Sequence, residues 1–446
     1  MDIVSQRQLA EHVIRTLRAA GHEALLAGGC VRDLILGRPP KDYDVATSAR
    51  PEQVVALFPK ALTVGAAFGV VVVVEEAVEV EVATFRSDRG YTDGRHPDAV
   101  AFTSAREDAL RRDFTINGMF LAPETGAVTD YVGGQEDLKA RVVRAIGDPR
   151  LRFGEDHLRL LRAVRFAAEL GFEIDPATAA AIKELAGKIS LVSGERVAAE
   201  LKRMLTTLPD GRRRGLALAS DLGLLAVILP ELEAMHGVKQ GPTVHPEGDV
   251  FVHTTLCVAE LREPSFELAM AGLLHDAGKP RTALMRDGRW TFYGHADVGA
   301  KSAEEVCARL RLSTLETRRI TWLVREHMKL MNAAEMRVAR LKRLMAEDAF
   351  EELAELWRAD CIASGGNAGP YEALMAQYRA LAHEEVKPAA LVTGDDLIGL
   401  GFTPGPAFRE ILDEVYDAQL EGRVPSKPQA LALARQLATE RCKPNC

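Results

Sequence analysis

Two aspartates within Lys41-Asp42-Tyr43-Asp44 have a spacing that could support catalysis. In an extended segment alternate side chains share one face, so the carboxylates of Asp42 and Asp44 would converge on one point. Mg²⁺ prefers carboxylate and phosphate oxygens, and a two-metal site can activate a 3′-hydroxyl while neutralising a pyrophosphate leaving group. The pattern therefore favours nucleotidyl transfer, although an isolated Asp-X-Asp is more often a solvated turn.

A glycine pair, Gly28-Gly29, stands between a predicted strand over residues 24–27 and a predicted helix that opens at Val31-Arg32-Asp33. Because glycine has no side chain, the backbone N–H groups of such a turn can approach a phosphate closely. Taken alone the signal is weak. It gains meaning from its place shortly before the paired aspartates.

The elements that would position these groups form a small α+β domain over residues 1–147. Apolar residues at helical spacing predict a helix over 6–20, and β-branched runs at 70–74 and 78–84 predict a hairpin in the same sheet. From Arg150 onward strand signals nearly vanish and helical spacing recurs. The remainder is therefore predicted to be mostly helical.

The string LAGGCVRDLILGRPPKDYDVAT, which contains both signals, resembles the opening motif of the class II tRNA nucleotidyltransferase and bacterial poly(A) polymerase family. Blocks at residues 81–86, 91–97 and 111–117 continue the resemblance in the same order. It implies a multidomain chain with a polymerase-β-like α+β nucleotidyltransferase head followed by all-α parts. The implied domains are a head (1–147), a base-selecting neck (148–208), a helical body or linker (209–242), an HD domain (243–370) and a helical tail (371–446).

Within the head, the resemblance implies that Asp42 and Asp44 hold Mg²⁺ and that Glu81 lends a nearby carboxylate. Glu79 competes for that role, because polar and apolar residues alternate along this strand. The family's nucleotide-binding positions correspond to Gly28, Gly29, Arg32 and Arg112, which would face the triphosphate, and to Asp113 and Asn117, which would shape the sugar pocket.

The segment from Glu155 to Phe166 lies in a predicted helix, where Asp156 and Arg159 would share a face. Cytosine and adenine each present an amino donor beside a ring-nitrogen acceptor, so a carboxylate next to a guanidinium could read both bases. The alternative is an ordinary surface ion pair, which is the commoner fate of such residues.

The longer string EDHLRLLRAVRFAAEL is similar to the family's base-selecting motif. The resemblance implies that Asp156 and Arg159 recognise the incoming CTP or ATP and that Arg162 and Arg165 approach its phosphates. The block Ser193-Gly194-Glu195-Arg196 resembles the helix-capping motif that follows, with Ser193 as a predicted N-cap.

An ordered set of histidines and aspartates marks the second half of the chain. Neutral imidazole with carboxylate is a common ligand set for transition metals. The spacing resembles the HD phosphohydrolase superfamily, which implies a first ion on His253, His275, Asp276 and Asp360 and a second on His295 and His327. Such a centre could hydrolyse phosphoesters with a divalent transition metal; an inactive HD fold is the alternative.

Charge and composition set broad limits on location and partners. The net charge of −8 argues weakly against a nucleic-acid partner, but the segment from Lys139 to Arg165 carries eight basic residues against three acidic ones and could meet phosphates. The six cysteines lack disulfide-framework or zinc-ribbon spacing, and no run of 18 uncharged apolar residues occurs. A cytoplasmic protein without a membrane segment is expected.

The function implied by the resemblance is template-independent addition of CCA, from CTP and ATP, to the 3′ end of tRNA. The segment from Asp88 to Pro97 matches a flexible-loop pattern that CC-adding members typically lack, so it favours full CCA-adding or A-adding activity, and an A-adding enzyme is one alternative. A poly(A) polymerase, an HD-domain phosphoesterase with an RNA-positioning head, and a catalytically silent RNA-binding module are the others.

Overall fold

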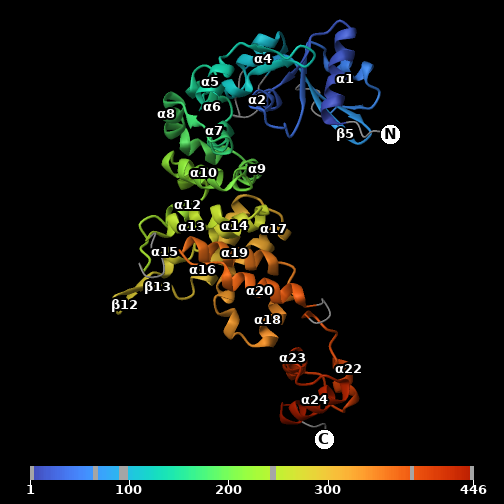
Figure 1. Cartoon of the computed structure of the whole chain (residues 1–446), viewed down its shortest axis with the longest axis vertical. Coiled ribbons are helices and arrows are strands. Elements are labelled where there is room, and N and C mark those ends of the chain that lie inside the picture. Colours follow the sequence, from blue (N-terminus) through green and yellow to red (C-terminus); the bar gives the residue numbers. More distant parts are fainter. Residues whose placement is uncertain (1–4, 64–68, 90–98, 242–247, 382–385, 442–446) are drawn as a thin grey trace. The chain divides into compact units, whose positions relative to one another are not determined.

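The computed structural model describes residues 5–63, 69–89, 99–241, 248–381 and 386–441 (Figure 1). These residues divide into two compact units. Unit 1 spans Met1–Glu233 with Ala308–Leu312, and unit 2 spans Ala234–Cys307 with Ser313–Cys446. The division falls inside the predicted 209–242 linker, and the finer predicted domain boundaries stay predictions.

Unit 1 begins with a mixed seven-stranded sheet whose strand order is β3-β4-β5-β2-β1-β8-β9. The strands are β1 (Ala24–Ala27), β2 (Asp44–Thr47), β3 (Ala61–Leu62), β4 (Val70–Glu75), β5 (Val78–Thr84), β8 (Met119–Ala122) and β9 (Ala127–Asp130). Helix α1 (Gln6–Ala19) buries the apolar side chains of Leu9, Val13 and Leu17. The predicted helix, first strand and hairpin are thereby confirmed.

The remaining elements of the head flank this sheet. Helix α2 (Gly29–Ile35) follows β1 directly. The others are α3 (Pro51–Leu57), the hairpin β6 (Arg86–Arg89) and β7 (Ala99–Phe102), α4 (Ala105–Leu110) and α5 (Gly134–Ala140). The aromatic rings of Phe85 and Phe120 meet edge to face at 5.7 Å in the core beneath β1 and β2. The flexible-loop pattern predicted up to Pro97 lies, from residue 90 onward, outside the described residues.

The neck of unit 1 is largely helical, with α6 (Pro149–Glu155), α7 (Leu158–Leu170), α8 (Pro176–Leu185), α9 (Gly194–Leu205), α10 (Pro209–Asp221), α11 (Leu225–Ile228) and α12 (Pro230–Glu233). Helix α7 is the central element, because ten of its side chains are buried and α9 and α10 both pack against it. A short parallel pair joins β10 (Val142–Val143), which precedes α6, to β11 (Glu173–Ile174), which follows α7. The predicted neck (148–208) is thus largely helical rather than all-α, because β11 lies within it, whereas β10 falls in the predicted head.

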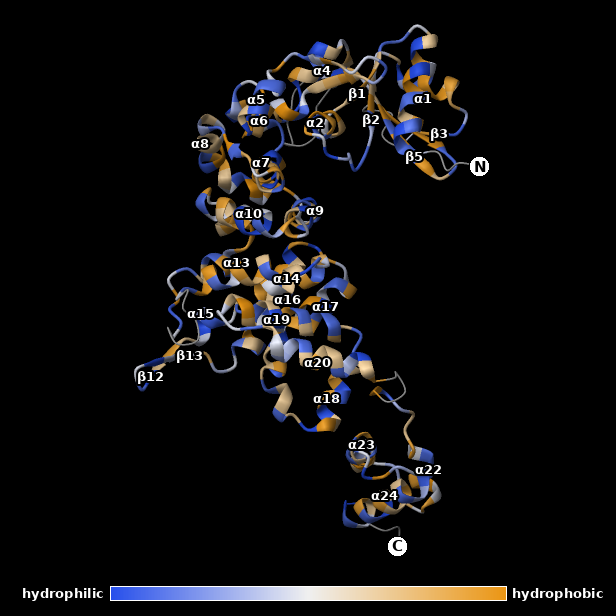
Figure 2. Cartoon of the chain, viewed as in Figure 1, coloured by the Kyte–Doolittle hydropathy of each residue, from blue (hydrophilic) through white to orange (hydrophobic). Residues whose placement is uncertain are grey.

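Unit 2 is built around α13 (Val250–Glu260), α14 (Phe266–Leu274), α17 (Thr314–Glu326) and α19 (Phe350–Ala363), which pack on one another. Eight of the nine residues of α14 are buried, so this helix is apolar on nearly every side (Figure 2). Around it lie α15 (Lys279–Thr282), α16 (His295–Arg309), α18 (Val338–Met345) and α20 (Gly369–Ala380). The tail helices α22 (Gly394–Gly399), α23 (Pro406–Leu420) and α24 (Lys427–Arg441) have an apolar core of their own.

A hairpin of β12 (Leu284–Arg286) and β13 (Arg289–Thr291) interrupts the helices of unit 2. The prediction that strands nearly vanish after Arg150 missed it. Its turn has Asp287 at φ 48° and Gly288 at φ 75°, the left-handed pair that a two-residue type I′ turn requires. Within the part of the chain that the structure describes, no helix is both long enough and apolar enough to cross a membrane.

Candidate functional site

The glycine turn between β1 and α2 lines a pocket of about 730 Å³ in unit 1. Gly28 has φ 76° and ψ −135°, a backbone conformation that only glycine adopts readily. A Cβ placed on Gly28 would lie 3.1 Å from Arg112 Nη1 and 3.8 Å from Asp44 Oδ2. The turn therefore brings the backbone close to a predicted phosphate ligand and a predicted metal ligand.

The two predicted metal-binding aspartates line the same pocket. Asp44 is the first residue of β2 and Asp42 precedes it. Strands β2 and β5 run parallel with Val45 opposite Val82, which brings Glu81 level with Asp44. Burial raises the pKa of Asp44 to about 6, and the negative charges of Glu81 and Asp42 add to this rise. Such crowding of carboxylates fits a site for divalent cations.

Glu79, the competing carboxylate, lies two residues further along β5, where it is opposite Val74 of β4. Both glutamates are exposed on the same face of the strand. Of the two glutamates, Glu81 is the one whose charge raises the pKa of Asp44. This placement favours Glu81 over Glu79, and a role in catalysis stays a prediction.

The predicted phosphate ligands Arg32 and Arg112 are fixed by hydrogen bonds inside the pocket. Arg32 Nη1 donates to Asn117 Oδ1 at 2.9 Å, and its guanidinium also pairs with Asp33. Arg112 Nη2 donates to Asp108 at 2.9 Å, and its Nη1 reaches the backbone carbonyl of Asn117 at 3.4 Å. Both cations are thus pre-oriented at the glycine turn, which is what binding of an anion requires.

Asp113 connects the head to α7 through hydrogen bonds. One carboxylate oxygen accepts from the backbone N–H of Phe114 at 2.8 Å and from Asn117 at 3.3 Å. The other accepts two hydrogen bonds from Arg162, at 2.9 and 2.7 Å. Although burial by itself raises the pKa of Asp113, the charges of Arg162 and Arg159 bring it down to about 2. Asp113 and Asn117 line the pocket, and contact with a sugar stays a prediction.

The helix predicted through Asp156 is wrong at this residue. Helix α6 ends at Glu155 and α7 begins at Leu158, so Asp156 lies between them in an extended conformation and accepts a hydrogen bond from the N–H of Leu158 at 3.1 Å. Arg159 Nη1 donates instead to Glu155 at 2.5 Å. Asp156 and Arg159 are therefore not neighbours on one helical face, yet both line the pocket.

Arg196 also lines the pocket. From the sequence it was predicted only as part of a helix-capping motif. Its Nη1 and Nη2 donate to the two oxygens of Asp156 at 3.1 and 2.7 Å, a bidentate pair. Ser193 occupies the N-cap of α9 as predicted, but its side chain makes no capping hydrogen bond there. A cation in the first turn of a helix opposes the helix dipole, and this was the available signal that Arg196 needs an anionic partner.

Arg162 and Arg165 extend from α7 toward the pocket, where both have acidic partners. Arg162 pairs with Asp113 and, at 3.4 Å, with Glu200. Arg165 pairs with Glu169 and with the buried Glu200. Burial opposes the charge of Arg162, but Asp113 and Glu200 raise its pKa above the ordinary value. Arg162 stays charged in a partly desolvated site. The implied contact of Arg162 and Arg165 with phosphates stays a prediction.

The pocket as a whole is positive, in contrast to the chain. Ten basic residues line it against six acidic ones, whereas the chain has a net charge of −8. A concave site with this balance attracts an anion more strongly than the rest of the surface does. The basic residues are Arg32, Arg38, Lys41, Arg111, Arg112, Arg159, Arg162, Arg165, Arg196 and Arg203.

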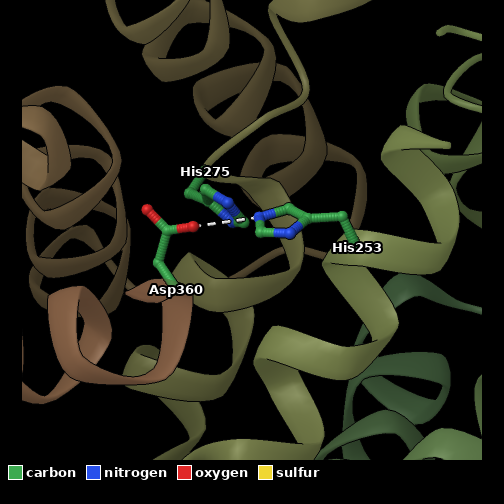
Figure 3. A group of neighbouring side chains, drawn as sticks. All are labelled: His253, His275 and Asp360. Atoms are coloured by element: carbon green, nitrogen blue, oxygen red, sulfur yellow. Dashed lines mark ion pairs between the residues drawn. The ribbon is translucent and has the colours of Figure 1, made fainter. Parts of the chain in front are cut away.

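A second centre lies in unit 2, where five helical segments bring together all six predicted metal ligands. The ligand atoms form two groups, each within 4.8 Å: His253, His275 and Asp360 in one, and Asp276, His295 and His327 in the other. Figure 3 shows the first group, with His253 Nε2 3.0 Å from Asp360 Oδ1. Asp276 connects the groups, because its carboxylate lies 3.3 Å from His275 Nε2 and 3.5 Å from His295 Nε2.

Backbone carbonyls orient three of the four imidazoles. The Nδ1 atoms of His275, His295 and His327 lie 2.7, 2.8 and 2.7 Å from the carbonyl oxygens of Gly272, Phe292 and Val324. Hydrogen bonds of this kind place the proton on Nδ1 and leave Nε2 as a ligand atom. With those tautomers, the Nε2 atoms of His295 and His327 lie 3.2 Å apart, and each points an unprotonated lone pair at the other. A cation between them would relieve this repulsion.

The protonation states also fit metal ligands. Burial and the neighbouring His275 lower the pKa of His327 to about 3, and burial lowers the pKa of His295. Burial alone raises the pKa of Asp360, but the hydrogen bond from His253 and the charge of His275 bring it down to about 2. Although burial opposes the charge of His275, the neighbouring Asp276 raises its pKa. His295 and His327 are thus neutral ligands beside ionised carboxylates, and His275 would lose a proton on binding a divalent transition metal.

Three family models match the chain. Residues 24–144 match the "Poly A polymerase head domain", residues 171–235 match the "Probable RNA and SrmB- binding site of polymerase A", and residues 250–362 match the "HD domain". The first falls in unit 1, the second falls there except for its last two residues, and the third contains all six histidine and aspartate ligands.

Two relatives match over nearly their whole length. The "CCA-adding enzyme" of Limosilactobacillus fermentum is 32% identical over 436 residues, 95% of each chain. The "A-adding tRNA nucleotidyltransferase" of Deinococcus radiodurans is 35% identical over 437 residues, 94% of this chain and 96% of that protein. Among solved structures, the Bacillus stearothermophilus CCA-adding enzyme in complex with CTP matches with a TM-score of 0.72 and 28% identity, over 98% of this chain and 99% of that one.

Proposed function

Because this chain belongs to the class II tRNA nucleotidyltransferase and poly(A) polymerase family, we propose that it completes the 3′ end of tRNA by adding CCA from CTP and ATP. The observation that carries the proposal is the pocket of unit 1. It holds paired aspartates beside a glycine turn, a positive lining, and a carboxylate, Asp156, that can accept from a base. The full-length likeness to a CCA-adding enzyme supports the same conclusion.

The catalytic end of the pocket is proposed to lie at β2. Asp42 and Asp44 would hold Mg²⁺, with Glu81 beside them, and the bound metal would neutralise charge on the reacting phosphate and lower the pKa of the attacking hydroxyl. The turn at Gly28-Gly29, with Arg32 and Arg112, would bind the triphosphate and leave its α-phosphate facing the tRNA 3′-hydroxyl. No covalent link to the protein is required.

The base-reading end is proposed to lie at the junction of α6 and α7. Asp156 would accept from the amino group of cytosine or adenine, and Arg159 would donate to the ring nitrogen beside it. Arg196 holds the Asp156 carboxylate at two points, so it fixes the direction in which that carboxylate can accept. Uracil and guanine present a carbonyl where Asp156 needs a donor, and these bases would be rejected.

The decisive experiment supplies two tRNA substrates, one that lacks CCA and one that lacks only the terminal A. CTP and ATP are given singly and together, and the products are sequenced. The proposal predicts that both tRNAs end in CCA. If only the second tRNA is extended, the chain is an A-adding enzyme like its relative from Deinococcus radiodurans. Long adenosine tails from ATP alone would instead identify a poly(A) polymerase.

Variants of Asp42, Glu81 and Glu79 test the catalytic end of the pocket, and Glu79 serves as the control. Asp42→Ala is expected to abolish transfer at any nucleotide concentration. Glu81→Gln is expected to reduce kcat, whereas Glu79→Gln, on the same face of β5, leaves it close to that of the unaltered protein. Equal losses in the two glutamine variants would contradict the assignment of Glu81.

The centre in unit 2 is proposed to bind a divalent transition metal and to hydrolyse phosphoesters. The support is the geometry of its four histidines and two aspartates. His275→Ala is expected to abolish metal-dependent hydrolysis of a generic phosphodiester and to leave nucleotide addition intact. If His275→Ala instead removed nucleotide addition and Asp42→Ala did not, unit 2 would carry the main activity. The proposed substrates of unit 1, tRNA and nucleoside triphosphates, are cytoplasmic molecules, so we propose that the protein acts in the cytoplasm.

A further inference from the structure

The hairpin β12–β13 is placed by chain continuity at the edge of the histidine and aspartate centre. Asp276 precedes it by one short helix, α15, and His295 follows it at the start of α16. Phe292, just after β13, accepts from His295 Nδ1 at 2.8 Å. Figure 1 shows the hairpin extending away from the helices of unit 2. A ligand bound on the hairpin would therefore lie next to this centre.

The two faces of the hairpin differ in character. In the pairing of β12 with β13, Arg286 is opposite Arg289, and Met285 is opposite Trp290. Opposite residues share a face, so the arginines lie on one side and the Met285–Trp290 pair on the other. The Arg286 guanidinium lies 5.7 Å from the ring centre of Tyr293, which places that tyrosine with the arginines. One face thus combines two cations with an aromatic ring.

This basic and aromatic face is exposed. Tyr293 exposes 77% of its surface, and Arg286 and Arg289 are exposed as well. Figure 2 colours the tip of the hairpin as hydrophilic. The cation–π contact with Arg286 leaves most of the tyrosine accessible to solvent, so its ring and the guanidinium are offered together to a ligand.

The charge of this segment is opposite to that of the chain. Between Ala277 and Gly294 there are four basic residues and one acidic residue, within a chain of net charge −8. The positive charge continues inward to Lys279, whose Nζ lies 2.6 Å from Asp276 and 2.6 Å from Gln240 Oε1, and 5.4 Å from the Phe292 ring. Lys279 is neutralised by Asp276, so an anionic ligand is favoured at the exposed arginines of the hairpin.

We propose that the β12–β13 hairpin binds single-stranded RNA, with an unpaired base stacked on Tyr293 and the adjoining phosphates on Arg286 and Arg289. Basic side chains that alternate with an exposed aromatic ring are the usual means of holding an unpaired strand, because every base offers a face for stacking. A duplex would meet the arginines but could not stack a base on the tyrosine. The proposal does not depend on nucleotide addition by unit 1.

The test uses the full-length protein and a short oligoribonucleotide of mixed sequence that carries 4-thiouridine. Because the pocket of unit 1 is also expected to bind RNA, total binding is not the measurement. Photo-crosslinks are mapped by mass spectrometry, and the yield on the peptide that contains Tyr293 is titrated against oligonucleotide concentration. We expect a crosslink on this peptide that unlabelled single strand competes away and that a duplex of the same length does not.

Matched variants separate stacking from a general effect on folding. Tyr293→Ala is expected to raise the apparent Kd from the crosslinking titration roughly fivefold or more, which is the low end for loss of one stacked base. Tyr293→Phe is expected to keep the apparent Kd of the unaltered protein. Leu315→Ala is the control, because Leu315 of α17 is also 77% exposed in unit 2. The melting temperature of each variant shows whether the fold of unit 2 is intact.

The arginines are tested by salt dependence. Arg286→Gln with Arg289→Gln is expected to reduce the slope of log Kobs against log salt by about 0.7 for each arginine, and Arg318→Gln, an exposed arginine of α17, leaves it unchanged. The proposal is overturned if no crosslink falls on the hairpin, if duplex competes as well as single strand, or if Tyr293→Ala binds like Tyr293→Phe. Incorporation of nucleotides into tRNA, measured on the same preparations, reports separately on the function proposed for unit 1.

Discussion

The backbone at Gly28 leaves no room for a side chain between Arg112 and Asp44. We predict that Gly28→Ala lowers kcat/KM for nucleotide incorporation roughly 100-fold, as a misplacement of about 1 Å near the chemistry does. The added methyl would lie 3.1 Å from Arg112 Nη1 in a conformation with φ 76° that alanine resists. The measurement is steady-state incorporation of CMP into tRNA lacking CCA.

Gly37 provides the control for Gly28. It also has a positive φ, of 68°, but a Cβ there would meet no heavy atom within 4 Å. Gly37→Ala therefore carries backbone strain without a clash in the pocket, and is expected to lower stability by about 1 kcal/mol with little effect on kcat/KM. Equal loss of activity in both variants would mean that strain alone, and not the approach to Arg112, explains the glycine.

Arg196 and Asp156 should act as one unit in base selection. We predict that Arg196→Ala, like Asp156→Ala, leaves transfer but increases incorporation of UMP and GMP, because each change frees the other side chain from a bidentate pair. In a double-mutant cycle the two losses of selectivity should not add. Arg203→Ala, on the same pocket but paired only loosely with Glu200 at 3.7 Å, is the control. Additive losses would show independent roles.

For single residues, the sequence could identify the side chains of a site but not the side chains with which they pair. The aspartates at 42 and 44 and the six ligands of unit 2 were predicted because their types and order are characteristic, and the structure brings each set together. The partner of Asp156 could not be predicted, because Arg196 is 40 residues away and belongs to another helix. Pairs formed by packing of distant segments leave no local pattern.

Among the elements, the hairpin of β4 and β5 carries a turn that its residues do not favour. Glu76 and Ala77 have φ of 52° and 82°, where a type I′ turn normally has asparagine or glycine. We predict that Ala77→Gly stabilises unit 1 by up to about 1 kcal/mol, since relief of left-handed strain outweighs the added freedom of the unfolded chain. The measurement is the urea midpoint followed by far-UV circular dichroism.

Ala180→Gly is the matched change with the opposite expected sign. Ala180 is an exposed residue inside α8, where replacement by glycine costs about 1 kcal/mol in helix propensity. Destabilisation by both changes would show that the turn at Ala77 is not strained in solution.

The sequence predicted the elements with strong patterns and missed those with weak ones. The β-branched run at 70–84 gave its hairpin correctly. The hairpin β12–β13 was missed because its strands have three residues each and no apolar alternation, although Asp287-Gly288 is a recognised signal for such a turn. The helix predicted through Asp156 began too early, since the hydrogen bond that the Asp156 side chain accepts from Leu158 ends the regular pattern there.

For the molecule as a whole, two compact units with separate sites imply two separate responses to ligands. The nucleotide pocket lies in unit 1, and the histidine and aspartate centre lies in unit 2. The chain has three tryptophans, Trp290, Trp322 and Trp357, and all of them belong to unit 2. Tryptophan fluorescence therefore reports the unfolding of unit 2 alone, whereas far-UV circular dichroism reports both units.

We predict that a divalent transition metal raises the melting temperature seen by tryptophan fluorescence, and that CTP with Mg²⁺ raises only a transition seen by circular dichroism. A ligand that binds the folded state stabilises it by RT ln(1 + [L]/Kd), about 2.7 kcal/mol at 100 times Kd. His275→Ala should remove the effect of the transition metal and keep that of CTP, and Asp42→Ala should do the reverse. A fluorescence transition that CTP shifts as much as the metal does would show that the two units unfold as one, because then stabilising either site would stabilise the whole chain.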